Sequence, residues 1–262
     1  MKYCIIIPTH DRISLLKKVL LVISRSAVAC ESSIIIVNSG NKLSLEQLIS
    51  SFHDLNILHI PVSSQHYWSK AIRSGMLYSL NLDYKYLIWM NDDIELVEDW
   101  VQIIESDLDD ADSNTVIVGT FRDSVGSISY GLKNKRRFLY PSEKERGIYM
   151  NGNLVVFPMD LVSSLGPMPS WLNHSIGDYL YGLKAIKLGY RLIPSSKFVG
   201  VCERHDFLEI WQDSSYPRLK RLSNLFQPKG LDYFKYSRYV ILYDRSSLIR
   251  KLISPLWRVL FK

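Results

Sequence analysis

Residues 86–96 read Y-L-I-W-M-N-D-D-I-E-L, and this stretch joins a strand signal to a chemical signal. The apolar run at its start has the length and residue types of a buried strand. It ends at once in Asn91, Asp92 and Asp93, and carboxylates at the end of a buried strand are costly unless something pairs with them. Such hard oxygen ligands suit Mg²⁺ or Mn²⁺, which proteins commonly share with substrate phosphates. The alternative is an acidic turn that only caps a helix over residues 97–106.

Around this stretch, apolar runs of strand length alternate with segments of helical spacing. The strands are predicted at residues 2–7, 33–37, 56–60, 86–90, 115–120, 153–157, 191–193 and 198–202. The helices are predicted at residues 14–24, 45–52, 69–80, 97–106 and 176–188. This alternation predicts an α/β fold with a mostly parallel sheet, covered by helices on both faces. Strands buried on both faces are uniformly apolar, as these are.

Ligands of such sheets bind at the carboxyl ends of the strands. Four loops follow the first four predicted strands, at residues 8–12, 38–41, 63–68 and 91–95. We therefore expect these loops to converge on one crevice.

Length and composition indicate a globular protein. A chain of 262 residues with 47% hydrophobic residues is long enough for one large α/β domain with a buried core. The first apolar run is too short for a signal peptide, since Pro8 and polar residues follow at once. No segment approaches the roughly 18 apolar residues of a membrane span. Cys4, Cys30 and Cys202 are odd in number and widely spaced, which fits neither a disulfide framework nor a zinc site and favours the cytoplasm.

Positive charge is concentrated near the C-terminus. From Arg218 onward the net charge is +9, whereas residues 1–217 carry −3, which points to an anionic partner for the C-terminal segment. In residues 245–262 apolar side chains recur at helical spacing beside basic ones, and Pro255 is expected to kink the helix. A basic amphipathic helix with Trp and Phe is typical of an interfacial membrane anchor. The alternative is a terminal helix packed on the domain.

Six segments, in this order, resemble the motifs of family 2 glycosyltransferases. They are I-I-I-P-T-H-D-R at 5–12, I-I-V-N-S-G at 35–40, Y-W-S-K-A-I-R-S-G at 67–75, M-N-D-D-I-E at 90–95, M-N-G-N at 150–153 and I-G-D-Y-L-Y-G-L-K at 176–184. Each motif is short, and their order and spacing together carry the resemblance. It implies the GT-A fold, which is Rossmann-like, and the inverting, metal-dependent enzymes of bacterial polysaccharide and O-antigen synthesis.

The resemblance implies a division of the chain. Residues 1–212 would be the GT-A catalytic domain, with a nucleotide-sugar half over about 1–110 and an acceptor half over 111–212. Residues 213–262 would be the basic amphipathic extension. The implied donor is a UDP- or dTDP-sugar, and the acceptor is a hydroxyl of a lipid-linked cell-surface glycan. We expect a cytoplasmic enzyme, peripheral at the inner face of the membrane, with an anionic membrane surface and other glycan-assembly proteins as partners and no nucleic acid.

The resemblance also implies roles for individual residues. The implied donor-binding residues are Pro8, Thr9, His10, Arg12, Asn38, Trp68, Arg73, Asn91 and Asp92. The implied ligands of Mn²⁺ or Mg²⁺ are Asp93 and His205. The implied acceptor-side residues are Asn151, Gly152, His174 and Gly177. Structural alternatives remain for several: a strand-ending turn for Asn38, core packing for Trp68 and a charged surface turn for His205.

Asp178 is the candidate general base. Attack of an acceptor hydroxyl on a sugar C1 needs a base, normally a carboxylate within hydrogen-bond reach of that hydroxyl. Asp178 lies at the start of a predicted helix, after Gly177, which we expect to permit close approach of substrate. The alternative is a helix cap, a role that Asp favours.

Two other functions use similar parts. A sugar-phosphate nucleotidyltransferase also combines an α/β domain with carboxylate-bound Mg²⁺, but it usually has a Gly-rich phosphate loop after its first strand. Residues 8–12 contain no glycine, which argues against that class. A non-catalytic glycan-binding relative is the third possibility, and retention of Asp92, Asp93 and Asp178 argues against it.

Overall fold

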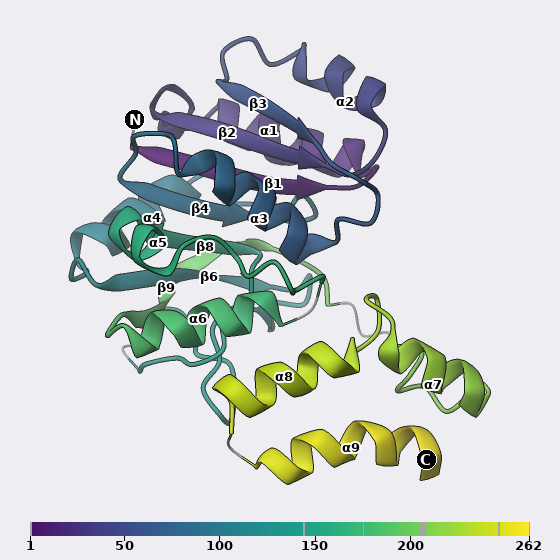
Figure 1. The fold of residues 1–262 in the computed structure, drawn as a ribbon. Helices are drawn as coiled ribbons and strands as arrows, with labels where there is room; N and C mark the ends of the chain where they lie inside the picture. The colour runs from purple at the N-terminus through teal and green to yellow at the C-terminus, as the bar shows by residue number, and fades with distance from the viewer. Residues whose placement is uncertain (1, 144, 175, 205–207, 246, 262) are drawn as a thin grey trace.

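The fold is that of a computed structural model, which describes residues 2–143, 145–174, 176–204, 208–245 and 247–261. Within these residues the strands form one nine-stranded sheet with helices on both faces (Figure 1). The strands are β1 (Tyr3–Thr9), β2 (Ser32–Asn38), β3 (Ile57–Pro61), β4 (Tyr86–Met90), β5 (Glu95–Leu96), β6 (Thr115–Arg122), β7 (Ile128–Tyr130), β8 (Leu154–Pro158) and β9 (Arg191–Val201). The helices are α1 (Ile13–Ser24), η1 (Ala27–Glu31), α2 (Lys42–Ile49), α3 (Trp68–Ser79), α4 (Trp100–Asp109), α5 (Met159–Leu165), α6 (Gly177–Lys187), α7 (Arg218–Phe226), α8 (Tyr233–Tyr243) and α9 (Leu248–Phe261).

The strand order is β3-β2-β1-β4-β8-β6-β9-β5, with β7 added on β6. Strands β1 to β4 are parallel to one another, as the alternating pattern predicts. Beyond β4 the sheet is mixed: β8 is antiparallel to β4 and β6, whereas β6 and β9 are parallel. The carboxyl ends of β1 to β4 therefore lie at one edge, which positions the four loops predicted to form a crevice.

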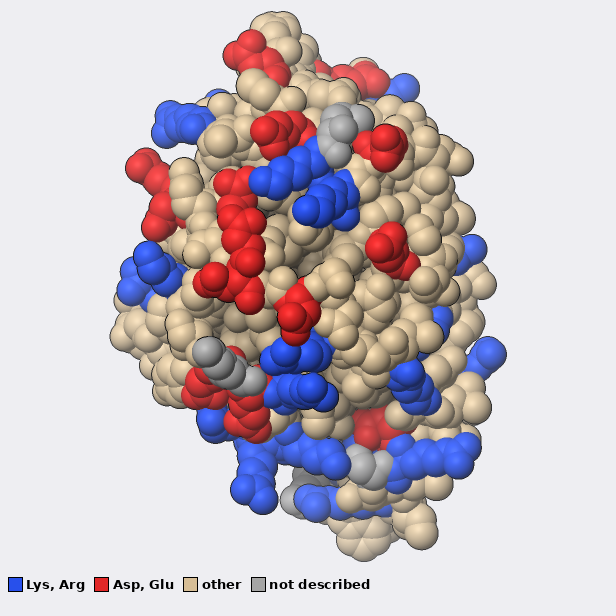
Figure 2. Space-filling view, turned by 90° about the vertical axis from the view of Figure 1, so that its left-hand side faces the viewer, with Lys and Arg blue, Asp and Glu red and all other residues tan. Residues whose placement is uncertain are grey.

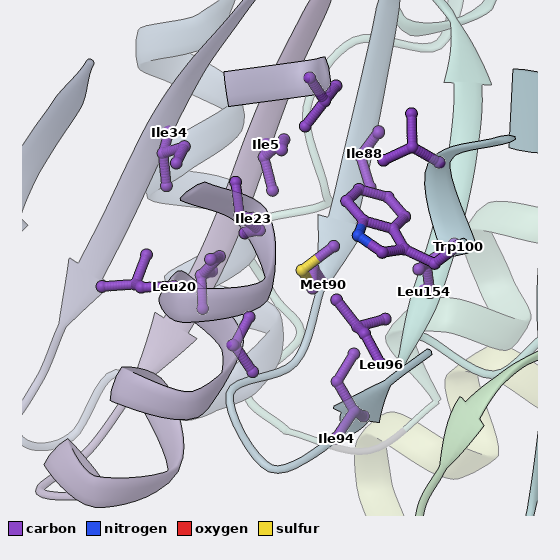
Figure 3. Packing of buried hydrophobic residues seen from close by; sticks show 14 of the residues in the cluster. Ile5, Leu20, Ile23, Ile34, Ile88, Met90, Ile94, Leu96, Trp100 and Leu154 are labelled. Carbon is purple, nitrogen blue, oxygen red and sulfur yellow. The ribbon is translucent and has the colours of Figure 1, made fainter. Parts of the chain in front are cut away.

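The two faces of the sheet bury two separate hydrophobic clusters. Alternate residues of a strand point to opposite faces, so Ile5 and Ile88 join the cluster under α1, α2 and α4 (Figure 3). Ile6 and Trp89 join the other cluster, under α3, α5 and α6. Both faces are therefore covered, which explains why the central residues of β1, β2 and β4 are apolar on both faces.

Two predicted elements take different bounds in the structure because distant strands pair there. The helix predicted at residue 97 begins at Trp100, because residues 95–96 pair with β9 and the Val97 N–H donates to the Val199 carbonyl. The acidic turn at residues 91–93 therefore does not cap this helix. The two strands predicted at residues 191–193 and 198–202 are one strand, β9. The register between β6 and β9 shifts near its middle, where Ser195 Oγ accepts the Thr120 N–H at 2.9 Å.

The C-terminal helices pack against the sheet domain. Tyr239 and Val240 of α8 are buried in the same cluster as α6, and Tyr149 Oη lies 3.1 Å from Asp244 Oδ2. Lys and Arg side chains gather at the lower end of the molecule, the level of α8 and α9 in Figure 1 (Figure 2). Among the described residues, no helix combines the length and the apolarity that crossing a bilayer would need.

Candidate active site

The four loops after β1 to β4 meet at one pocket of about 480 Å³, as predicted from the strand pattern. Eight of the predicted site residues line it: Pro8, Thr9, His10, Arg12, Trp68, Asn91, Asp93 and His174. It is also lined by Ser39, Ser64, His66, Tyr67, Ala71 and Lys229. We call this the donor-side pocket.

Arg12 neutralises the two aspartates at the end of β4. Its Nη2 lies 2.7 Å from Asp92 Oδ1, its Nε donates to Asp92 Oδ2, and its Nη1 pairs with Asp93 Oδ2. Asp92 is fully buried, so it does not face the pocket, and burial raises its pKa to about 6 although the Arg12 charge lowers it. Asp93 keeps 20% of its side chain exposed and lines the pocket. The aspartate available to a ligand is therefore Asp93.

Trp68 and Asn91 form a rigid wall between this pocket and the rest of the site. Trp68 Nε1 donates to Asn91 Oδ1 at 2.7 Å, and Asn91 Nδ2 donates to Asn153 Oδ1 at 2.8 Å. Trp68 also packs edge-on against Trp89, with ring centroids 5.6 Å apart. Gly152 lies against the same indole, because a Cβ at this position would be 2.3 Å from Trp68 Cζ2. Trp68 thus both lines the pocket and packs, and Gly152 is required by that packing.

Asp178 lies on the other side of this wall, in the first turn of α6. Its Oδ2 accepts the Gly152 N–H at 3.2 Å, and its Oδ1 accepts the Tyr179 N–H at 2.8 Å. The side chain is half-buried, and burial raises the pKa of Asp178 to about 6 although these N–H donors lower it. The N-cap position belongs to Ile176, which has φ +62° and a strained left-handed backbone. Asp178 is therefore not the N-cap residue of α6.

A second pocket of about 320 Å³ lies beside Asp178. It is lined by Ser129, Tyr130, Gly131, Lys133, Phe138, Tyr149, Asn151, Tyr179 and Arg204. We call this the acceptor-side pocket. Tyr179 follows Asp178 directly, and Asn151 precedes the glycine whose N–H binds Asp178. The Asp178 carboxylate therefore lies beside the acceptor-side pocket, although it lines neither pocket.

Three predicted site residues, Asn38, Arg73 and Gly177, contact other parts of the protein and do not line the donor-side pocket. Asn38 is buried. Its Oδ1 accepts the Gly40 N–H at 2.8 Å and its Nδ2 donates to the Asn41 carbonyl, so its side chain stabilises the turn after β2. Arg73 Nη1 donates to the Met168 carbonyl at 2.6 Å and does not line the donor-side pocket. A Cβ on Gly177 would lie 2.4 Å from Ser69 Oγ of α3. The absence of a side chain at Gly177 therefore allows α3 to pack closely against α6 and does not make room for a substrate. His205 lies outside the described residues.

Several pocket residues carry no motif signal in the sequence. Lys229, between α7 and α8, lines the donor-side pocket and places its Nζ 5.7 Å from the centroid of the Tyr67 ring. Lys133 lies in a basic run that is otherwise a solvated loop. The general excess of positive charge after Arg218 is the only signal that points toward Lys229, and it does not single out that residue.

The donor set around Asp93 suits a hard cation that is shared with a ligand. Within the described part of the chain, no group of three or more His, Cys, Asp or Glu side chains is close enough to hold a metal ion by itself. One pocket-facing carboxylate is nevertheless the kind of ligand that Mg²⁺ uses together with substrate phosphates and water. The residues present therefore fit a cation that completes its coordination with a bound diphosphate.

Comparisons with solved structures support the fold. A mannosyltransferase, PcManGT from Pyrobaculum calidifontis, in complex with GDP-Man and Mn²⁺, has 15% identity over 97% of this chain and 74% of its own, with a TM-score of 0.60. TarS from S. aureus, in complex with UDP-GlcNAc, has 13% identity over 99% of this chain and 82% of its own, with a TM-score of 0.60. GalNAc-T7 with UDP, GalNAc and Mn²⁺ has 16% identity over 98% of this chain and 55% of its own, with a TM-score of 0.62.

These likenesses establish a GT-A fold, with its largely parallel sheet. A comparison with curated proteins gave no match. A family model described as "Glycosyl transferase family 2" matches residues 4–160, which is more than half of the chain and runs from the second residue of β1 through the end of β8. This match favours sugar transfer over the nucleotidyltransferase and the non-catalytic alternatives. The chain belongs to glycosyltransferase family 2, and it is a glycosyltransferase with a nucleotide-sugar fold.

Proposed function

We propose that this glycosyltransferase inverts the anomeric centre as it moves a sugar from a UDP- or dTDP-sugar to a hydroxyl of a lipid-linked bacterial cell-surface glycan, such as O-antigen. The observation that carries this proposal is the position of Asp178. Its hydrogen-bond partner Gly152 packs on Trp68 of the donor-side pocket, and its neighbour Tyr179 lines the acceptor-side pocket. A base at that point can reach an acceptor hydroxyl on one side while the donor sugar occupies the other. The nucleotide sugars bound by the solved relatives, GDP-Man and UDP-GlcNAc, support a nucleotide-sugar donor.

In the proposed mechanism Asp178 takes the proton of the acceptor hydroxyl as that oxygen attacks C1. The carbon–oxygen bond to the diphosphate breaks, and the nucleoside diphosphate leaves from the opposite face of the sugar, which inverts the configuration at C1. With a pKa of about 6, Asp178 is mostly ionised at pH 7 yet basic enough to accept a proton. Two backbone N–H groups fix the orientation of the Asp178 carboxylate.

The leaving diphosphate needs positive charge near it. Arg12 and Lys229 line the donor-side pocket, and Lys229 forms no ion pair with the residues that the structure describes. We assign Lys229 to the diphosphate and Arg12 mainly to the orientation of Asp93. Asp93 would hold Mn²⁺ or Mg²⁺, which when bound would stabilise the charge that develops on the leaving group. The Mn²⁺ in the PcManGT and GalNAc-T7 structures supports a divalent cation here.

A nucleotide panel tests this proposal. The melting temperature of the full chain should rise with one of UDP, dTDP or GDP and rise further with Mn²⁺, because a ligand that binds only the folded state stabilises it. Asp93→Ala should lose the Mn²⁺-dependent increment and sugar transfer while keeping the wild-type melting temperature without ligand. The proposal is wrong if no nucleoside diphosphate stabilises the folded protein.

We further propose that residues 1–212 form the catalytic domain and that the extension over 213–262 holds this enzyme at the inner face of the cytoplasmic membrane. Helix α9 supports this idea through an exposed apolar stripe. Ile249, Ile253, Trp257 and Phe261 recur at four-residue spacing and keep 73%, 53%, 54% and 62% of their surface exposed. The opposite side of α9 packs inward through Val259, which is fully buried.

Because α9 is packed on one side, point variants test the anchor better than deletion. Each basic residue near an anionic bilayer contributes about 1 kcal/mol of attraction. We expect the full chain to sediment with vesicles that contain anionic lipid, and Ile253→Ser with Trp257→Ser to reduce sedimentation at unchanged melting temperature. Leu43→Ser, which changes a leucine 70% exposed on α2, is the matched control. Equal sedimentation of the three proteins would contradict an anchor in α9.

A further inference from the structure

Two cations converge in the acceptor-side pocket. Lys133 Nζ lies 4.0 Å from the centroid of the Phe138 ring, and the Arg204 guanidinium carbon lies 5.5 Å from the same centroid. Both side chains line the pocket beside Asp178. The two residues are far apart in the sequence, so the fold and not a local basic run brings them together.

Within the described residues, neither cation forms an ion pair with a carboxylate. Among the described residues, the ion pairs include Arg137 with Glu143 and Glu145, but none that involves Lys133 or Arg204. Lys133 is half-buried, and burial lowers its pKa, with the Arg204 charge lowering it further. Asp178 acts on Lys133 in the opposite direction, through space. Lys133 is partly desolvated whereas Arg204 is exposed, and holding the two like charges close together costs free energy that an anionic ligand would offset.

The backbone and the aromatic rings hold this pair in place. The Lys133 N–H donates to the Tyr149 carbonyl at 2.8 Å, and the Tyr149 N–H donates back to the Lys133 carbonyl at 3.0 Å. Arg204 Nη2 donates to the Ile128 carbonyl at 2.7 Å, which fixes one end of the guanidinium. The rings of Tyr149 and Tyr179 lie 5.4 Å apart and form an aromatic wall. Such a wall offers the apolar face against which a sugar ring packs, and the fixed cations offer specificity at little entropic cost.

The pocket begins next to the base. Tyr179 and Asn151, which flank Asp178 and its Gly152 partner, both line it. A sugar whose hydroxyl reaches Asp178 therefore extends its other substituents toward Lys133 and Arg204. An anionic group found there belongs to the acceptor sugar itself or to the unit attached to it.

We propose that the acceptor-side pocket is a subsite for an anionic acceptor, a sugar bearing a carboxylate or a phosphate whose oxygens bind Lys133 and Arg204. This inference rests on the proposed function, because it takes Asp178 as the residue that faces the acceptor hydroxyl. It goes beyond that function by giving the acceptor a chemical class. Tyr149, Tyr179 and Phe138 contact the sugar, and the two cations select its charged substituent.

The test compares charged and neutral sugars in matched pairs. The probes are the 4-nitrophenyl glycosides of glucose, galactose and mannose, the corresponding uronic acids, and the corresponding hexose 1-phosphates. Binding to the full chain is measured by saturation-transfer NMR titration, with and without a saturating nucleoside diphosphate. We expect at least one anionic probe to bind about tenfold tighter than its neutral partner or more, since hydrogen bonds to charged groups are the strong ones. The uronic acid and phosphate arms show which oxyanion is selected.

Lys133→Met and Arg204→Gln should each reduce that preference about tenfold, while nucleotide affinity and melting temperature stay at wild-type values. Arg136→Gln removes the same charge from the same loop without lining the pocket, and it should keep the preference. The inference is overturned if the wild type shows no anionic preference in any pair, if both variants retain it, or if Arg136→Gln loses it equally. A wild type that binds the anionic probes but no nucleotide would instead contradict the proposed function.

Discussion

Replacing Asp178 by Asn tests the proposed base most directly. The amide has nearly the size of the carboxylate, and its single oxygen can still accept one of the two N–H groups from Gly152 and Tyr179. We therefore expect the fold to survive with the loss of about one hydrogen bond, roughly 1 kcal/mol. The amide cannot take a proton at neutral pH, and general base catalysis typically contributes 10²- to 10⁴-fold. We therefore expect kcat to fall by about that factor, with little change in donor affinity, because Asp178 lies beyond the wall formed by Trp68.

The pH dependence gives a second, independent magnitude. Burial raises the pKa of Asp178 to about 6, so its carboxylate is about nine-tenths ionised at pH 7 and about one-tenth ionised at pH 5. A base works only in its ionised form, so kcat/KM of the wild type should rise with pH through about 6. The value at pH 5 should be about a tenth of the plateau. The Asn variant should retain a low activity without this rising limb.

Initial rates of sugar transfer between pH 4.5 and 8, with donor and acceptor varied separately, provide the measurement. Melting curves at each pH separate loss of catalysis from loss of fold. Near wild-type turnover of Asp178→Asn, or the same rising limb in wild type and variant, would refute the assignment of Asp178 as the base and leave it a structural residue of the first turn of α6.

Two further variants probe the donor side. Arg12→Leu leaves the fully buried Asp92 without a cation. Breaking a buried ion pair costs about 3–5 kcal/mol of unfolding free energy. Because the Arg12 side chain is 42% exposed, we expect a smaller loss of roughly 2 kcal/mol. Burial raises the pKa of Asp92, so its ionised form is the one that needs Arg12. The loss of unfolding free energy in Arg12→Leu should therefore be small at pH 5 and grow as pH rises through and above about 6. Denaturant unfolding in EDTA measures it. A loss independent of pH would contradict it. Lys229→Met should weaken nucleoside diphosphate binding about tenfold in calorimetric titration while leaving nucleoside binding unchanged. The control is Lys220→Met, since Lys220 does not line the donor-side pocket. Equal nucleoside diphosphate affinity in the wild type and both variants would place Lys229 outside the site.

Prediction from the sequence worked best where structure depends on near neighbours. The strands β1 to β4 and the helices α1 and α3 lie within one or two residues of the predicted ranges, because unbroken apolar runs and helical spacing are local signals. The prediction failed where a distant partner decides the outcome. Residues 95–96 became strand because β9 pairs with them, and α4 starts later for that reason.

The predicted site shows the same division. Asp93 and Asp178 could be selected from their motifs. The structure places Asp93 in the donor-side pocket and Asp178 beside Gly152 and Tyr179, next to the acceptor-side pocket. Arg73 could not be rejected from its motif, because nothing nearby in the sequence reveals the Met168 carbonyl that binds its guanidinium. A short motif identifies which residues occur together, but side-chain direction depends on which polar partner the folded chain brings within reach.

The sequence by itself determined the α/β class, the parallel direction of the first four strands and the edge of the sheet at which their loops converge, because hydrophobic periodicity and strand-to-loop transitions are encoded residue by residue. Tertiary structure alone decided that Lys229 of the C-terminal extension lines the donor-side pocket and that Lys133 lies beside Arg204. The physical reason is that these cations acquire their roles from packing between distant segments. A place in a pocket wall and contact with an aromatic ring are properties of the assembled chain, and no local pattern records them.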